Sequence, residues 1–364
     1  MQTKRSFGVD ILKILAMLMI CGYHVLEHGG VLAALTPGSV SYAAAWLIAG
    51  SSTCGVNMFA MASGYLGAGR RVRLSSAVMH WLQVAFYTVL ITLAAAVLWP
   101  GLVGKQELLN ALLPVTFQQY WYVTAYFCML AFSPVMNHAL AHLPRRELAG
   151  CMAGILLLLS VQQTALQYDI YGVNHGYSAL WLMAMYLAGG LWKRFEADAP
   201  AWTVPAGFMT AGVCFALILG FRVRVNALAA AGIPQESSPA LLMRFTSPLM
   251  VLAAFSLLAA CSRLTCRNAS AVRVIMGLSQ ATFGVYLIHD HPFIRARVIG
   301  QSFSWLAGLP WPALLLLAIA CAAGVFLVCA AAETLRAGLF RLLRVKTAVI
   351  WAEERALRFL TRHE

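Results

Sequence analysis

Apolar residues occur along this chain in runs of about twenty, and shorter segments that hold most of the charged residues separate these runs. A run of that length matches a helix that crosses the hydrocarbon core of a bilayer. Backbone groups in lipid must be paired within their own segment, and the runs do not alternate as barrel strands do, so we expect helices. The pattern predicts about ten spans, near residues 9–29, 42–66, 76–99, 119–138, 149–167, 178–192, 202–221, 240–261, 275–294 and 311–334.

The composition supports a membrane protein. Of the 364 residues, 61% are hydrophobic and only 11% are charged, which is more apolar surface than a soluble domain of this size can bury. We therefore expect an all-α polytopic membrane protein whose residues 1–335 form one transmembrane domain. The nine cysteines are dispersed and show no C-x-x-C spacing, so a disulfide framework is not expected.

Positive charges are distributed unequally between the loops on the two sides. The formal net charge of +13 would suggest a nucleic-acid partner for a soluble protein. Here Lys and Arg alternate with the spans, and we expect no nucleic acid. The positive-inside rule places the richer side, which includes both termini, in the cytoplasm. The basic residues in the loops of the other side are only Lys105, Arg222, Arg224, Arg295 and Arg297.

Residues 336–364 form a basic segment after the last span. Leucine, phenylalanine and arginine recur there at near-helical spacing, as in Leu339, Leu342, Leu343 and Phe359. This pattern is typical of an amphipathic helix that lies on the cytoplasmic leaflet and contacts membrane lipid. A solvated positive tail explains the same charges equally well.

Ionisable residues of the first span share one helix face. Lys13 and His24 are eleven residues apart, so they lie within about 20° of each other and roughly 16 Å apart along the axis. Asp10, Glu27 and His28 fall within about 60° of the same line. Ionisable groups at membrane depth normally face the bundle interior or a wet cavity. Alternatively, Lys13 extends to the cytoplasmic surface, and His24 is a structural histidine with a satisfied hydrogen bond.

Four motifs occur in a fixed order along the chain. They are D-I-L-K-I-L-A followed by His24, G-V-N-M-F-A-M-A-S-G-Y-L (55–66) with the R-x-x-R of Arg70 and Arg73, W-Y-V-T-A-Y-F-C-M-L-A-F-S-P-V-M-N (121–137) and T-F-G-V-Y-L-I-H (282–289). In this order they resemble acyltransferase family 3, the integral-membrane O-acyltransferases that modify cell-surface carbohydrates, over essentially the whole chain. The sequence departs from the family at Lys13, where many members have arginine, and at Asn57 and Ala60, where many have proline and phenylalanine.

The resemblance implies a bacterial inner-membrane enzyme with a cytosolic acyl-CoA donor. Acetyl-CoA is expected from family frequency, as a co-substrate and not as a bound cofactor. The planar guanidinium group donates paired hydrogen bonds to phosphate oxygens. Arg70 and Arg73 are therefore the expected donor-binding residues, together with Lys13. On charge alone, the R-R-V-R segment, which also includes Arg71, could simply determine topology.

The resemblance also implies an acceptor hydroxyl, on a cell-surface or lipid-linked carbohydrate at the outer face. We expect His24 to act as general base because an imidazole titrates near neutrality. A transient acyl-imidazole is the less favoured alternative. Glu27 is expected to orient His24 or His28. The expected acceptor-side residues are His28, Trp121, Tyr122 and His289.

The sequence also allows three other interpretations. His289, Asp290 and His291 invite a metal site, but consecutive helical positions point about 100° apart, so no metal is expected there. Trp121 and Tyr122 also fit an aromatic belt at the membrane interface.

A transporter or flippase for a polar or lipid-linked substrate would show similar spans. Such carriers often contain repeated halves, and we find no convincing repeat.

Overall fold

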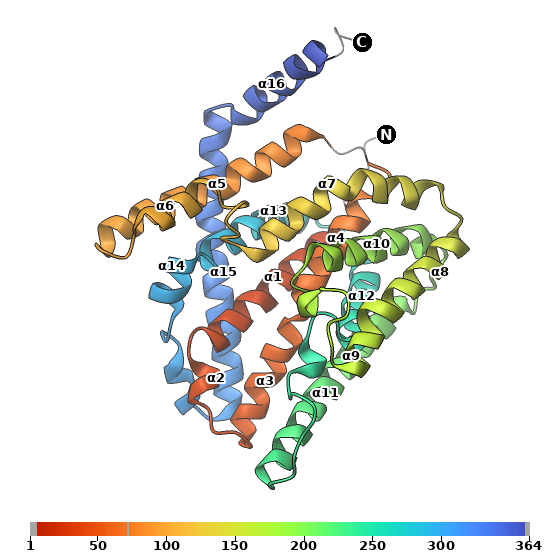
Figure 1. Ribbon diagram of the computed structural model, residues 1–364, viewed down its shortest axis with the longest axis vertical. Coiled ribbons are helices and arrows are strands. Elements are labelled where there is room, and N and C mark those ends of the chain that lie inside the picture. Colours follow the sequence, from red (N-terminus) through yellow and green to blue (C-terminus); the bar gives the residue numbers. More distant parts are fainter. Residues whose placement is uncertain (1–5, 71–72, 361–364) are drawn as a thin grey trace.

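The computed structural model describes residues 6–70 and 73–360, and Figure 1 shows that this part of the chain is a bundle of helices. No strand occurs within it, which confirms the all-α expectation. The main helices are α1 (Phe7–Glu27), α3 (Val40–Ser52), α4 (Cys54–Gly67), α5 (Leu74–Leu98), α7 (Trp121–His142), α8 (Arg145–Leu156), α10 (Ala179–Phe195), α11 (Thr203–Ala230), α12 (Pro248–Ser262), α13 (Ala269–His289), α15 (Trp311–Leu342) and α16 (Val345–Leu360). Shorter helices are α2 (Val31–Ala34), α6 (Lys105–Leu112), α9 (Gln163–Leu166) and α14 (Pro292–Ile294).

Eight helical segments in the described ranges are long and apolar enough to cross a membrane. The chain is therefore a multi-pass membrane protein, but the count of ten is not confirmed. The expected span 178–192 corresponds to α10, which has only 17 residues. The eight segments are Phe7–Glu27, Leu74–Leu98, Trp121–His142, Arg145–Leu166, Thr203–Ala230, Leu241–Ser262, Ala269–His289 and Trp311–Leu342.

The expected span 42–66 is interrupted at Thr53, between α3 and α4. Three consecutive hydroxyls at this point bond to backbone carbonyls. Ser51 and Ser52 both donate to the carbonyl oxygen of Ile48, at 3.0 and 2.7 Å, and Thr53 donates to that of Gly50 at 2.8 Å. Such local bonds compete with the helical hydrogen-bond ladder and bend helices. The S-S-T sequence is therefore the physical reason why one apolar run forms two helices.

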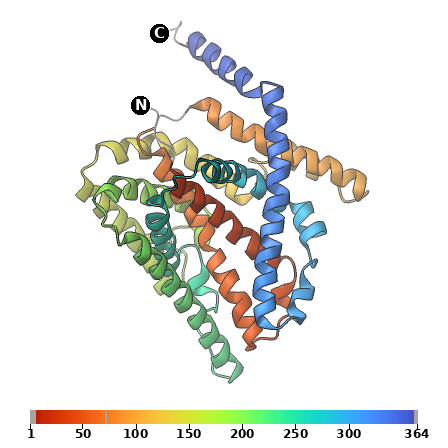
Figure 2. The ribbon, with the colours of Figure 1, turned by 180° about the vertical axis from the view of Figure 1, so that it is seen from behind.

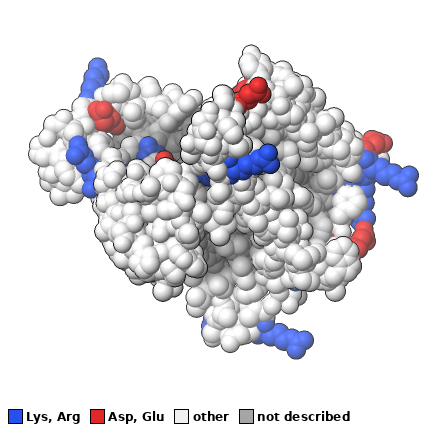
Figure 3. Space-filling view, turned by 90° about the horizontal axis from the view of Figure 1, so that it is seen from below, with Lys and Arg blue, Asp and Glu red and all other residues white. Residues whose placement is uncertain are grey.

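The charge distribution agrees with the predicted orientation, although the location of the termini stays a prediction. Figure 2 shows α16 beyond the end of α15, on the side of the molecule where α1 begins. The opposite end, seen in Figure 3, displays only a few scattered Lys and Arg side chains on a mostly uncharged surface. Lys4, Arg5 and Arg71, which contribute to the predicted cytoplasmic charge, lie outside the described residues.

Helix α1 lies at the centre of the bundle and packs against α3, α4, α12, α13 and α15 (Figures 1 and 2). Glycines permit the closest approaches. A Cβ atom on Gly8 would lie 1.7 Å from the carbonyl oxygen of Cys261, and one on Gly64 would lie 1.8 Å from that of Tyr186. Helices α4 and α10 therefore touch through their backbones, as small residues at membrane-helix interfaces allow.

Helix α16 contacts the start of α5. Helix α15 continues to Leu342, so the expected domain boundary at residue 335 lies within a helix, and α16 begins only at Val345. The carboxylate of Glu353 accepts a hydrogen bond from the backbone N–H of Ser75 at 3.1 Å. This bond satisfies one of the unpaired amides at the first turn of α5. Hydrogen bonding from the side chain and then from the backbone of Ser75 lowers the pKa of Glu353.

Replacement of Glu353 by glutamine is expected to loosen this contact, which hydrogen exchange at the Ser75 amide would detect as severalfold faster exchange. Glu354→Gln is the matched control, because Glu354 is exposed and pairs with Arg358 of its own helix at 3.6 Å. Because the folded-state pKa of Glu353 is lowered, the contact contributes above the unfolded-state pKa and is lost as pH falls through the folded-state pKa. Equal exchange in both variants would contradict a capping role.

Candidate functional site

A cavity of about 610 Å³ lies between α1, α4, α5, α7 and α13. Its size is within the range typical of small-molecule sites. Lys13, Arg70 and Arg73 line one part, which we call the basic end. His24 and Asp290 line another part, which we call the histidine end. The cavity therefore joins residues that the sequence assigned to donor binding with the one assigned to proton transfer.

The basic end is held by hydrogen bonds to the backbone. The ammonium group of Lys13 donates to the carbonyl oxygen of Ser279 at 3.1 Å. The Asn137 side chain donates to the carbonyl oxygen of Arg70 at 3.1 Å and accepts from the hydroxyl of Tyr186 at 2.8 Å. Asn137 thus fixes the backbone from which the Arg70 side chain extends, while that side chain is exposed.

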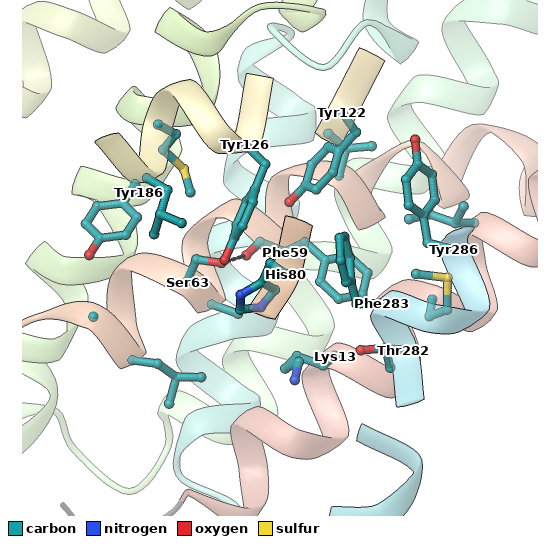
Figure 4. A pocket seen from close by; sticks show the side chains of 18 of the residues that line it. Lys13, Phe59, Ser63, His80, Tyr122, Tyr126, Tyr186, Thr282, Phe283 and Tyr286 are labelled. Carbon is teal, nitrogen blue, oxygen red and sulfur yellow. Dashed lines mark hydrogen bonds between the residues drawn. The ribbon is translucent and has the colours of Figure 1, made fainter. Parts of the chain in front are cut away.

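Aromatic rings also line the cavity. Figure 4 shows Tyr122, Tyr126, Phe283 and His80 around part of it, with Lys13 nearby. The rings of Tyr122 and Tyr126 stack at 6.1 Å, and that of Tyr126 lies 6.4 Å from Phe283. His80 bonds through Nδ1 to the carbonyl oxygen of Ser76 at 2.7 Å. The sequence analysis missed His80, although it is the fifth residue of the predicted span 76–99, and a histidine within a span is the kind of signal that identified His24.

The imidazole of His24 lies among polar groups from two helices. Its ring is 5.0 Å from that of His289 and 4.9 Å from that of His28. Nδ1 of His24 lies 3.9 Å from Oδ1 of Asp290, which is buried. Glu27, the expected orienting carboxylate, is exposed and does not line the cavity. Asp290 is thus a carboxylate beside His24 that the sequence analysis did not assign to this role, and the orienting role expected of Glu27 stays a prediction.

The other expected histidines lie behind or beside the cavity. His289 is buried, and its Nδ1 bonds to the carbonyl oxygen of Val285 at 2.6 Å, so it does not reach the cavity surface. His28 is half-buried and does not line the cavity. Burial and then the positive charge of Arg295 lower the pKa of His28, which favours the neutral imidazole. An acceptor role for these two histidines stays a prediction.

Trp121 and Tyr122 both line the cavity. The indole of Trp121 lies 4.5 Å from the ring of Tyr177 and stacks on Phe245 at 5.8 Å, and both of these rings also line the cavity. Asn57 holds Phe245 in place by donating to its carbonyl oxygen at 2.9 Å. The departure from the family pattern at Asn57 therefore provides a buried amide that supports this aromatic cluster.

Three groups near the histidine end could bind a metal ion. His24, His28 and Asp290 each offer one ligand atom, and these atoms lie within 4.8 Å of one another. However, the guanidinium group of Arg295 donates to Oδ1 of Asp290 at 3.1 Å. This cation occupies the same carboxylate oxygen that faces His24, and its charge would repel a divalent ion. The donor set thus fits a proton-transfer site better than a metal centre.

Comparisons with known proteins support the sequence motifs. A family model described as an acyltransferase domain matches residues 6–333, nearly the whole chain. The match covers α1 through most of α15 and so includes every residue of the cavity. Neither the curated proteins nor the solved structures gave a match.

Proposed function

Because the chain belongs to acyltransferase family 3, which implies acyl transfer to carbohydrates in a membrane, we propose a specific reaction. The protein transfers an acyl group, by family frequency acetyl, from cytosolic acyl-CoA to a hydroxyl of a cell-surface or lipid-linked carbohydrate. The bacterial inner membrane is the proposed location. The observation that carries this proposal is that Arg70 and His24 line the same cavity.

The basic end suits the phosphates of a CoA thioester. Arg70 and Arg73 can donate several hydrogen bonds each to phosphate oxygens, whereas Lys13 adds a compact positive charge farther along the cavity. Lys13 and His24 are eleven residues apart on α1, a rise of roughly 16 Å. An extended pantetheine arm can follow the ring-lined section and bring the thioester carbonyl towards His24.

His24 is the proposed general base. It takes the proton of the acceptor hydroxyl as the hydroxyl oxygen attacks the thioester carbonyl. The C–S bond breaks when the tetrahedral intermediate collapses, and the proton passes to the departing CoA sulfur. The products are a carbohydrate ester and free CoA, and the histidine returns to its neutral form.

The aromatic cluster near His24 is the proposed acceptor site. Trp121, Tyr177 and Phe245 present flat apolar surfaces, which can pack against the C–H faces of a sugar ring, while the Tyr177 hydroxyl offers a polar contact. Apolar rings together with a small number of polar groups are typical of pockets that bind small molecules.

The reaction can be tested with purified protein in lipid nanodiscs, acetyl-CoA and a glycan extract from a strain that lacks the gene. Release of the CoA thiol should require the extract, and mass spectrometry should find a new acetyl ester on the glycan. Surface glycans of the deletion strain should lack the same ester. Movement of a glycan across proteoliposomes without acetyl-CoA, and no thiol release, would contradict acyl transfer and favour a carrier.

A further inference from the structure

We propose that Asp290, held by Arg295, is the positioning residue of His24. This inference rests on the proposed function, in which His24 takes the proton of the acceptor. The two residues are 266 positions apart in the sequence and meet because α1 and α13 pack against each other.

The two nitrogens of His24 have different surroundings. Nδ1 is buried without a hydrogen-bond partner in the described part of the chain, and Oδ1 of Asp290 is 3.9 Å away. That separation is longer than a hydrogen bond, but catalytic hydrogen bonds in unliganded sites often shorten when substrate binds. A proton on Nδ1 that points at Asp290 leaves Nε2 as the basic nitrogen for the acceptor, because a neutral imidazole carries one proton.

A backbone hydrogen bond and an ion pair hold Asp290 in position. Asp290 directly follows α13, and its backbone N–H donates to the carbonyl oxygen of Tyr286 at 3.1 Å. The chain then turns at Pro292, so that the Arg295 guanidinium group reaches back to Oδ1 of Asp290 at 3.1 Å. Arg295 is partly exposed, whereas only 8% of the Asp290 side chain is exposed. This ion pair gives the buried carboxylate a compensating charge in a place where an unpaired carboxylate would be costly.

Three side chains with ionisable groups lie close to the His24 ring. His28 and His289 approach it within 5 Å ring to ring, but each is an imidazole that burial disfavours as a cation. Asp290 places a carboxylate oxygen 3.9 Å from Nδ1 of His24. When His24 takes the acceptor proton it becomes a cation. The carboxylate of Asp290 attracts this charge and the guanidinium group of Arg295 opposes it, so the role that the geometry carries for Asp290 is to orient Nδ1 of His24.

The test is a cycle of variants in nanodiscs: wild type, His24→Gln, Asp290→Asn and the double variant, each assayed for kcat and for the KM of acetyl-CoA. We expect Asp290→Asn to lower kcat about 100-fold, with little change in the donor KM. It should cause little additional loss in the His24→Gln background, because the two residues act as a unit. Asp290→Glu should recover part of kcat.

Each alternative outcome has a distinct meaning. Wild-type kcat in Asp290→Asn, or an equal loss with and without His24, would overturn the positioning role while leaving the proposed function intact. Wild-type kcat in His24→Gln would instead contradict the proposed function. Thermal unfolding of each variant and of the control Asp198→Asn, an exposed aspartate paired with Arg145, separates a loss of folding from a loss of chemistry.

Discussion

Replacement of His24 by glutamine is expected to reduce kcat by about a thousandfold or more, while acetyl-CoA still binds. Glutamine keeps much of the volume of histidine but has no basic nitrogen, so the acceptor hydroxyl would have to attack without losing its proton to the enzyme. The donor contacts at Arg70 and Arg73 lie at the other end of the cavity and remain. Thiol release measures kcat, and calorimetry on the same nanodiscs measures donor affinity.

Chemical rescue by free imidazole tests whether the lost group at position 24 is a base. In His24→Gly the cavity has room for a free imidazole, which should restore part of the activity as its concentration rises. Restoration in His24→Gly but not in Asp290→Gly would identify the missing group as the base itself. A His24→Gln protein that is folded, binds acetyl-CoA and transfers acetyl at the wild-type rate would contradict the assignment.

The second large effect concerns the donor. The double variant Arg70→Ala and Arg73→Ala is expected to raise the KM for acetyl-CoA by about 100-fold, since each charge-assisted hydrogen bond to a phosphate contributes about 1.5–3 kcal/mol. The KM for S-acetyl-pantetheine, which has no phosphate groups, should change little. Comparison of the two thioesters therefore isolates the phosphate contacts from any general effect on the cavity.

Arg145→Ala is the matched control for this comparison, because Arg145 is an exposed arginine that pairs with Asp198 away from the cavity. It should leave the KM of both thioesters unchanged. An equal rise in KM for acetyl-CoA and S-acetyl-pantetheine in the double variant would show that Arg70 and Arg73 support the structure of the cavity and do not bind phosphate.

The placement of the α1 residues was accessible from the sequence because it depends on one helix. The spacing of Lys13 and His24 fixes their common face, and both side chains line the cavity. The family resemblance is confirmed over residues 6–333. The match of Arg70 and Arg73 to the R-x-x-R motif likewise placed them at the cavity, although Arg71 lies outside the described residues.

The carboxylate at His24 could not be found in the same way. Glu27 is close in sequence, but it lies at the last position of α1, where it is exposed. Asp290 comes within 3.9 Å of His24 because α1 and α13 pack against each other, which no local pattern encodes. The same limitation applies to the spans. Hydropathy detects an apolar run, but hydroxyl bonds at Ser51 to Thr53 divide the run into two helices.

The ring-lined part of the cavity also bears on the energy supply of the cell. Under the proposed function, Tyr122, Tyr126 and Phe283 stand between a pool of cytosolic thioester and an external carbohydrate. A permanently open aqueous path there would let protons leak and dissipate the membrane potential. In the proposed reaction the aromatic rings favour a passage that the pantetheine arm, and not a column of water, fills during turnover. The proposed enzyme would thus export an acyl group without becoming an ion channel.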